Sequence, residues 1–422
     1  MTIPFSPHHC LRGLTTRRYH TTGSASVFAI LLLLGSHLCA QEDSDTPEDP
    51  VLGQAGGALC AAAPSIRWAG YLSTTGVYGN TNGAEVTEDS PLAPTSARGE
   101  NRSLAAAEGW KAGAAKVNIT PDEFMWMSGY GGRSKPADGK VHDLWAKAVA
   151  MKDPTGKTAV FVSTDLITVP IKMVNAVMAE ITRQHGLGRS EVMFTCSHTH
   201  CGPALDEMLS HMLDMKDPDW KQVRGYQRTL NAKLVTLIGA AVKDLKPAAV
   251  SFGNGRCHFA SNRRAPKGIG PYDHDVPVLK IGSPDGRSLR AVIFGYACHN
   301  TVMSYYKWSG DYAGFAQLYL EGRHPGTTAL FFAGCGADQN PLPRRREELA
   351  RKYGRMLGVA VDQVLDGPTT PISGRIATRF ENIELAFDSL PKKAALLEVQ
   401  KTGSRYRKAW AGNLLKQYDL QN

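Results

Sequence analysis

Cysteine is scarce in this sequence, and long apolar runs are absent after the N-terminal region. Only 8 of the 422 residues are cysteines, too few for a disulfide-stapled scaffold of this length, and their spacing matches no zinc ribbon. We expect most of them to be small buried side chains. A membrane-spanning helix needs about 20 consecutive apolar residues. No run of that length occurs, so we expect no transmembrane domain.

An aromatic and basic stripe of the kind that binds nucleic acid is also missing. The formal net charge is +9, but acidic residues are interleaved through most of the chain. Part of the positive charge is local, as in the arginine run of residues 344–346. This pattern is typical of a solvated surface and predicts no nucleic-acid partner. With 42% apolar and 21% charged residues, the composition is that of a globular protein.

Residues 1–40 have the features of a secretory signal peptide. A basic segment ends near His20, an apolar core occupies residues 25–34, and a cleavage site lies near Ala40. A retained membrane anchor is the alternative, but the core is shorter than a spanning helix. We expect an exported protein, periplasmic or secreted. Residues 41–108 are rich in small residues and proline without periodicity, which predicts a disordered low-complexity linker.

From residue 109 onward the sequence alternates between strand-like and helix-like segments. Such alternation predicts an α/β fold in which helices cover a mixed β-sheet core. We assign residues 109–390 to this domain and residues 391–422 to a C-terminal helical segment, with no C-terminal immunoglobulin-like domain. Strands are expected over residues 111–119, 144–152, 158–164, 192–196, 248–253, 276–281, 289–297, 328–332 and 372–387. Helices are expected over residues 173–184, 219–245, 312–322 and 345–365.

Two histidines stand directly after one of the expected strands. His198 and His200 follow the strand at 192–196, and residues two apart on an extended chain point the same way. Their imidazoles can therefore face one small volume, one as a metal ligand and the other as ligand or base. Gly202 and Pro203 then force a turn. The alternative to a metal site is that both histidines are structural and only form hydrogen bonds.

Three further segments follow predicted strands, so that they can converge on this motif. His299 ends the strand at 289–297, where a satisfied buried histidine is the alternative to a ligand. Asp311 begins a helix, where it can act as an N-cap or orient a ligand histidine. The small residues of segment 332–341 let the backbone approach a ligand closely. An ordinary strand-to-helix loop is the alternative for that segment.

Together these segments resemble the catalytic domain of the neutral/alkaline non-lysosomal ceramidases over roughly residues 110–387. Several signatures occur in the same order as in the family. They are Ala115-Lys116-Val117-Asn118-Ile119-Thr120-Pro121, Ser128-Gly129-Tyr130, Ser197-His198-Thr199-His200-Cys201-Gly202-Pro203, Asn262-Arg263, His299-Asn300-Thr301 and Ser309-Gly310-Asp311-Tyr312-Ala313-Gly314.

The resemblance implies a zinc-dependent amidohydrolase that splits ceramide, or a related N-acyl lipid, into an amine and a fatty acid. It implies that His198 and His299 bind Zn²⁺, that His200 serves as base or acid, and that Arg263 holds the amide oxygen. Zinc lowers the pKa of bound water to about 7 and polarises a carbonyl, and a guanidinium stabilises an oxyanion. Peripheral contact with a membrane fits such a substrate, and the oligomeric state stays open.

The sequence departs from the family pattern in two places. The family carries a serine near the scissile amide, whereas segment 336–341 offers Gln339 or Asn340 and no hydroxyl. We therefore expect different substrate contacts, with Asn340 and Asp311 as substrate-binding residues. The family takes two more zinc ligands, a glutamate and a tyrosine, from a C-terminal region that has no match before Asn422. The zinc site is thus expected to be incomplete, as in a truncated chain.

Two other functions stay open at this point. A hydrolase of a smaller amide or ester on the same scaffold fits the missing serine. An inactive fragment or pseudoenzyme, kept as a binding module, fits the missing zinc ligands. The bound zinc content, and the turnover of long-acyl against short-acyl amides, distinguish these functions from the first.

Overall fold

The structure is a computed structural model that describes residues 109–206, 215–265, 269–383 and 391–420. The expected signal peptide and linker, residues 1–108, lie outside the described residues. Within the described ranges, no helix is both long enough and apolar enough to cross a membrane. Most of the cysteines in those ranges are buried, as expected: Cys201, Cys257 and Cys298 are buried, and Cys196 and Cys335 are partly buried.

The first of two large β-sheets is built around a predicted hairpin. Its strands are, in spatial order, β5 (Val192–Cys196), β4 (Thr158–Thr164), β3 (Trp145–Lys152), β1 (Lys111–Asn118) and β6 (Lys246–Pro247). Strands β3 and β4 pair antiparallel across a turn in which Asp153 Oδ1 accepts the backbone N–H groups of Thr155 and Lys157, at 2.9 Å each. Helix α3 (Ile171–His185) connects β4 to the parallel β5 through the short 3₁₀ turn η1 (Arg189–Glu191), and the predicted C-cap Gly186 has φ 67°.

The second sheet is assembled from the later strands. Its order is β12 (Thr328–Ala333), β10 (Leu289–Tyr296), β9 (Asp275–Gly282), β7 (Ala249–Arg256) and β14 (Thr370–Pro371). Helix α5 (Asp311–Arg323) links β10 to the parallel β12, and α6 (Glu347–Asp366) follows. The other pairs in this sheet are antiparallel. Two short pairs complete the set, β2 (Gly139–Lys140) with β11 (Lys307–Trp308) and β8 (Ala260–Asn262) with β13 (Gln339–Pro341).

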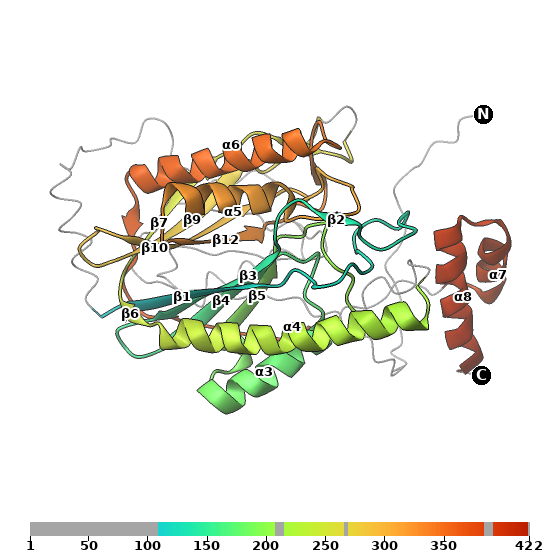
Figure 1. Ribbon diagram of the computed structural model, residues 1–422, viewed down its shortest axis with the longest axis horizontal. Coiled ribbons are helices and arrows are strands. Elements are labelled where there is room, and N and C mark those ends of the chain that lie inside the picture. Colours follow the sequence, from blue (N-terminus) through green and yellow to red (C-terminus); the bar gives the residue numbers. More distant parts are fainter. Residues whose placement is uncertain (1–108, 207–214, 266–268, 384–390, 421–422) are drawn as a thin grey trace, which may run out of the picture.

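The two sheets face each other, and helices cover their outer faces (Figure 1). Helices α3 and α4 (Asp217–Lys243) lie on the first sheet, and α5 and α6 lie on the second. Alternation along β3 explains this layering, because Val149 and Met151 join the core between the sheets while Ala148 and Ala150 join the core with the helices. The predicted α/β class with helices on mixed sheets is confirmed, with two sheets in place of one.

The strand predicted at residues 372–387 is wrong over the residues that the structure describes. Pairing ends with β14, residues 372–383 contain no strand, and residues 384–390 lie outside the described ranges. Gly374, with φ 116°, turns the chain, and Ile376 is buried while its N–H donates to Asp153 Oδ2 at 2.6 Å. The segment therefore crosses the first sheet's turn without finding a strand edge to pair with.

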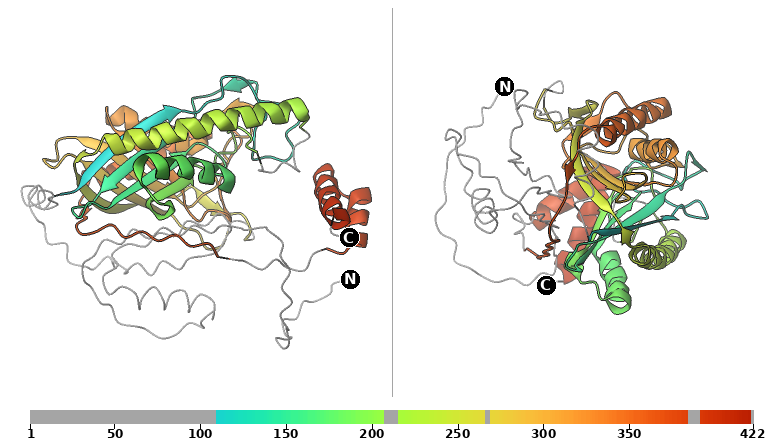
Figure 2. Two further views of the ribbon diagram at one scale, coloured as in Figure 1. Left: turned by 90° about the horizontal axis from the view of Figure 1, so that it is seen from below. Right: turned by 90° about the vertical axis from the view of Figure 1, so that its left-hand side faces the viewer.

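The last two helices form a hairpin of their own. Helices α7 (Lys393–Thr402) and α8 (Arg405–Leu420) pack around Leu396, Ala411 and Leu415. Figures 1 and 2 show this hairpin standing beside the layered domain. Its small core is separate from the two main cores, so it contributes nothing to positioning the histidines.

Candidate metal centre

Three histidines converge at the end of the two sheets where β5 and β10 finish. His198 and His200 lie on the loop after β5, and His299 lies just after β10. One nitrogen from each ring can be chosen so that all three lie within 4.8 Å of one another. The ring centroids are 4.8 Å apart for His198 and His299, and 5.1 Å for His198 and His200. The structure thus brings together the histidines that the sequence singled out.

Backbone carbonyls fix the orientation of two of these rings. His198 Nδ1 lies 2.6 Å from the carbonyl oxygen of Ile167, and His299 Nδ1 lies 2.8 Å from that of Gly336. A carbonyl oxygen only accepts hydrogen bonds, so each Nδ1 carries the proton and each Nε2 keeps a lone pair. An imidazole that donates its second nitrogen to a carbonyl in this way is typical of metal-ligating histidines.

His200 reaches the same point from the other side. Its Nε2 lies 3.4 Å from Nε2 of His198, and its backbone N–H donates to the carbonyl of Asn300 at 3.3 Å. The buried Nδ1 of His200 has no hydrogen-bond partner among the described residues. The ring of Tyr130 lies 4.9 Å from the His200 ring, centroid to centroid. His200 is therefore held mainly by packing and by its own backbone.

Burial keeps all three imidazoles neutral. Desolvation lowers the pKa of His198. Desolvation, followed by the charges that His198 and His299 would carry, lowers the pKa of His200 to about 2. Desolvation and the neighbouring His198 lower the pKa of His299 to about 4. Neutral imidazole is the form that binds metal ions, so the group is ready to bind one at neutral pH.

Backbone strain is concentrated at this site. Within the described ranges, the non-glycine residues with positive φ are His198 (56°), Asp311 (54°) and Arg345 (85°). Such conformations are costly for residues with a Cβ and persist where the surroundings enforce them, often at functional sites. All three lie on loops around the histidines, which marks these loops as parts of one constrained assembly.

Asp311 supports the loop that carries His299. Its carboxylate accepts the N–H groups of Met303, at 2.8 Å, and Tyr312, at 2.7 Å, and the side chain is fully buried. The N-cap position of α5 is Gly310, so the N-cap prediction for Asp311 is wrong, because its carboxylate turns toward the preceding loop. Among the described residues, its carboxylate makes no hydrogen bond to a histidine ring. Its contact with substrate stays a prediction.

Arg263 lies at the edge of the histidine group. Its Nε and Nη2 donate to the carbonyl of Ala337 at 3.0 and 2.7 Å, and its backbone N–H donates to Asp338 at 2.7 Å. The charge of Arg263 contributes to lowering the pKa of both His198 and His299. The guanidinium is exposed to solvent, so it is free to meet a bound ligand.

Asn340 is placed on β13, next to the loop that supports His299. It is buried, and its side-chain Oδ1 has no hydrogen-bond partner among the described residues. The neighbouring Gln339 is already engaged, because its Oε1 accepts the N–H of Asp273 at 3.1 Å and its carbonyl accepts the N–H of His299 at 2.9 Å. Of the two residues at the position of the family's serine, Asn340 keeps a free polar atom.

Sequence reasoning gave no role at the site to several residues that border the histidines, although it quoted Gly129 and Tyr130 as part of a family signature. Tyr130 packs against His200, and Gly129 must be glycine, because a Cβ there would lie 2.7 Å from the Cβ of His200. Arg344 and Arg345 were assigned to a solvated surface. The signal that could have found them is their position directly after segment 332–341, whose small residues already indicated a site.

The donor set fits a zinc ion. Zinc binds imidazole nitrogen at about 2.0–2.1 Å in tetrahedral geometry, which places two ligand nitrogens about 3.4 Å apart. The two Nε2 atoms of His198 and His200 have that separation, 3.4 Å. Glu381, an acidic residue on the segment after β14, is exposed and pairs with Arg379 at 2.8 Å. It therefore adds nothing to the donor set.

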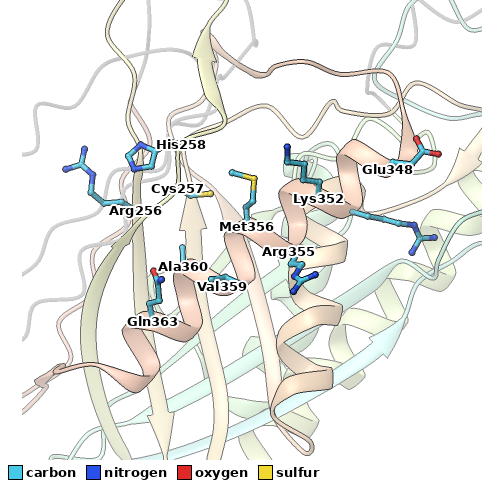
Figure 3. Close-up of a pocket in the computed structure, with 11 residues that line it drawn as sticks. Arg256, Cys257, His258, Glu348, Lys352, Arg355, Met356, Val359, Ala360 and Gln363 are labelled. Carbon is cyan, nitrogen blue, oxygen red and sulfur yellow. The ribbon is translucent and has the colours of Figure 1, made fainter.

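A hollow of about 590 Å³ lies on the outer face of α6 (Figure 3). Its lining comes from α6 and from the end of β7, and it includes the cationic side chains of Arg256, Lys352 and Arg355. None of the three histidines lines it. The hollow is therefore distinct from the candidate metal centre.

Comparison with known proteins connects the site to one family. The profile described as neutral/alkaline non-lysosomal ceramidase, N-terminal, matches residues 110–337. A solved structure titled "Ceramidase complexed with C2" has 22% identity and a TM-score of 0.55, and the match covers 63% of this chain and 45% of that one. The neutral ceramidase from Pseudomonas aeruginosa has 21% identity and a TM-score of 0.55, with 63% and 46% covered. The present chain thus spans less than half of either solved chain, and at this identity the likeness shows a shared fold. No curated protein sequence matches.

Proposed function

The chain belongs to the neutral/alkaline non-lysosomal ceramidase family, and from this premise we propose that it hydrolyses an N-acyl amide with the help of Zn²⁺. The proposed ligands are His198 and His299, and the proposed substrate is ceramide or a related N-acyl lipid. The observation that carries the proposal is the convergence of the two rings, each of which gives its Nδ1 to a backbone carbonyl and keeps the lone pair on Nε2. Export and peripheral contact with a membrane belong to the same proposal.

The residues around the ligands have roles that match amide hydrolysis. Zn²⁺, when bound, supplies a Lewis acid that acidifies water and polarises a carbonyl. His200 transfers the proton from the attacking water to the leaving nitrogen. The exposed guanidinium of Arg263 stabilises the negative charge that develops on the amide oxygen. Asn340 offers a hydrogen bond to the substrate at the position where the family has serine.

A second role for His200 has its own support. The 3.4 Å separation of its Nε2 from Nε2 of His198 is that of two ligands on one tetrahedral zinc ion. Catalytic zinc sites with three histidines and one open position are well established. In that case His200 completes the ligand set that the sequence left incomplete, and proton transfer falls to another group.

Zinc content and fatty-acid release test the function and distinguish the two roles. Purified chain is loaded with zinc, dialysed and assayed on ceramide and on long-acyl and short-acyl amides. The proton-carrier role predicts that His200→Ala keeps its zinc and loses activity by a factor of about 10²–10⁴. The ligand role predicts that the same variant loses zinc. The exposed His258 supplies the control His258→Ala, for which no change is expected.

Two results would replace the proposal with one of its alternatives. Equal turnover of short-acyl and long-acyl amides would favour a hydrolase of small amides or esters. Wild-type chain that keeps no zinc after dialysis and releases no fatty acid would favour a binding module without catalysis. The first outcome would remove the proposed substrate, and the second would remove the proposed chemistry. Both would leave the family membership unchanged.

A further inference from the structure

A second group of cations surrounds the histidines beyond Arg263. Arg344 and Arg345 lie on the loop between β13 and α6, and both contact the surroundings of the segment that follows His299. Arg344 Nη1 lies 3.5 Å from Thr301 Oγ1, two residues after His299. The guanidinium of Arg345 lies 5.2 Å from the ring centre of Tyr130, and that ring packs on His200. Together with Arg263, three guanidinium groups flank the triad.

The loop that carries these arginines is built rigidly. The N–H of Arg345 donates to Val302 at 2.6 Å, and Tyr305 Oη donates to the carbonyl of Arg345 at 3.2 Å. Tyr353 Oη donates to the carbonyl of Pro343 at 2.8 Å. Arg345 also holds a φ of 85°, a conformation that a non-glycine residue adopts only under constraint. The backbone of this loop is therefore held in one conformation.

None of these cations forms a close ion pair within the described ranges: Arg263, Arg344 and Arg345 are absent from the salt bridges. Carboxylates act on two of them at longer range, Asp338 on Arg263 and the buried Asp311 on Arg345. The charges of Arg263 and Arg344 both help to lower the pKa of His299. Three guanidinium groups that repel one another at a site are best compensated by a ligand that brings negative charge.

We propose that the substrate carries an anionic group beside its amide bond, and that Arg344 and Arg345 bind it. Ceramide is uncharged and would leave both guanidinium groups without a close ion pair. An N-acyl amino acid fits better, because its carboxylate lies within a few bonds of the amide and matches the planar fork of arginine. Water adds to the carbonyl carbon, the C–N bond breaks, and the nitrogen takes the proton, which releases a fatty acid and an amino acid. This substrate class rests on the proposed hydrolytic function.

Two matched amides test the proposal with the zinc-loaded full chain. N-dodecanoylglycine carries a carboxylate, and N-dodecanoylglycinamide differs only in having a neutral amide in its place. The charged substrate should be hydrolysed with a higher kcat/KM by at least about tenfold. Arg344→Gln and Arg345→Gln should raise KM for the charged substrate by about 10- to 100-fold and affect the neutral substrate much less. Arg346→Gln, the exposed neighbour in the same run, is the control. Equal turnover of the two amides, or an equal loss on both in Arg344→Gln, would overturn the proposal.

Calorimetric binding separates this proposal from the hydrolytic one. The same two amides are titrated into wild type and into Arg344→Gln, with no dependence on turnover. Tighter binding of the carboxylate, weakened in the variant, supports the anion site even where no amide is hydrolysed. Binding of both amides with the same affinity overturns the anion site, whatever the activity. Circular dichroism of each variant confirms that a lost preference does not come from unfolding.

Discussion

His198 and His299 come from loops at the ends of strands in two different sheets, yet their ring centroids lie 4.8 Å apart. The two loops are joined directly, because the N–H of His200 donates to Asn300. They are also joined indirectly, because Thr199 Oγ1 donates to Ser309 and Asn300 Nδ2 donates to Gly310. The geometry of the site therefore depends on residues between the histidines as much as on the histidines themselves.

Thr199 is the first of these supporting residues to test. Its buried hydroxyl donates to the carbonyl of Ser309 at 2.6 Å and accepts the N–H of Cys201 at 3.1 Å. Thr199→Val leaves both partners unsatisfied, so the free energy of unfolding should fall by about 1–3 kcal/mol. Urea denaturation measures the change. The exposed Thr229 makes one hydrogen bond within α4, and Thr229→Val should change stability by less. Equal effects of the two substitutions would contradict the supporting role.

Gly129 offers a test of the packing beneath His200. Its φ is 105°, and a Cβ at this position would lie 2.7 Å from the Cβ and Cγ of His200. Gly129→Ala should therefore destabilise the fold by about 1–3 kcal/mol and displace the His200 ring. Denaturation and zinc affinity are measured together. At Gly132 an added Cβ meets nothing within 4 Å, so Gly132→Ala is the matched control and should leave both quantities unchanged. An unchanged Gly129→Ala protein would contradict the close approach.

Asp311 predicts how stability depends on pH. Burial raises its pKa from 3.8 to about 6, so the folded chain keeps a proton at pH values where the unfolded chain has lost it. The stabilisation is fully present below pH 3.8 and is lost as the pH rises through about 6. Relative to wild type, Asp311→Asn should gain about 3 kcal/mol of stability between pH 4 and pH 7.

Denaturation at several pH values between 4 and 7 checks this prediction. The exposed Asp285 has its pKa lowered, mainly by a hydrogen bond from Ser283, and Asp285→Asn should show no such gain. A stability difference between Asp311→Asn and wild type that is constant with pH would show that the carboxylate is not penalised by burial.

The sequence predicted most of the fold because its signals are local. The strands expected at residues 144–152 and 158–164 and the helix expected at residues 219–245 follow from the periodicity of apolar residues. The strand predicted at residues 372–387 is absent from the described part of that segment because strand formation depends on distant residues. A strand needs a neighbouring edge, and whether one is free depends on the packing of distant segments.

The site was predicted only in part, because some of its residues leave a local signal in the sequence and others do not. The strand-end pattern located the three histidines and the family resemblance added Arg263, and the structure brings the histidines together with Arg263 at their edge. The carbonyls of Ile167 and Gly336 that fix two rings could not be predicted, because a backbone acceptor leaves no mark in the sequence. Arg345 was missed because its orientation comes from a strained backbone that no residue pattern announces.

Whether the triad is a zinc site is tested by the zinc bound per chain, measured by elemental analysis after dialysis. We predict one zinc ion per wild-type chain at neutral pH, and a loss of affinity of more than about 100-fold in both His198→Ala and His299→Ala. His258→Ala, which alters an exposed histidine outside the triad, should bind zinc like wild type. Wild-type chain that holds no zinc, or a His198→Ala variant that holds it as tightly as wild type, would contradict this prediction.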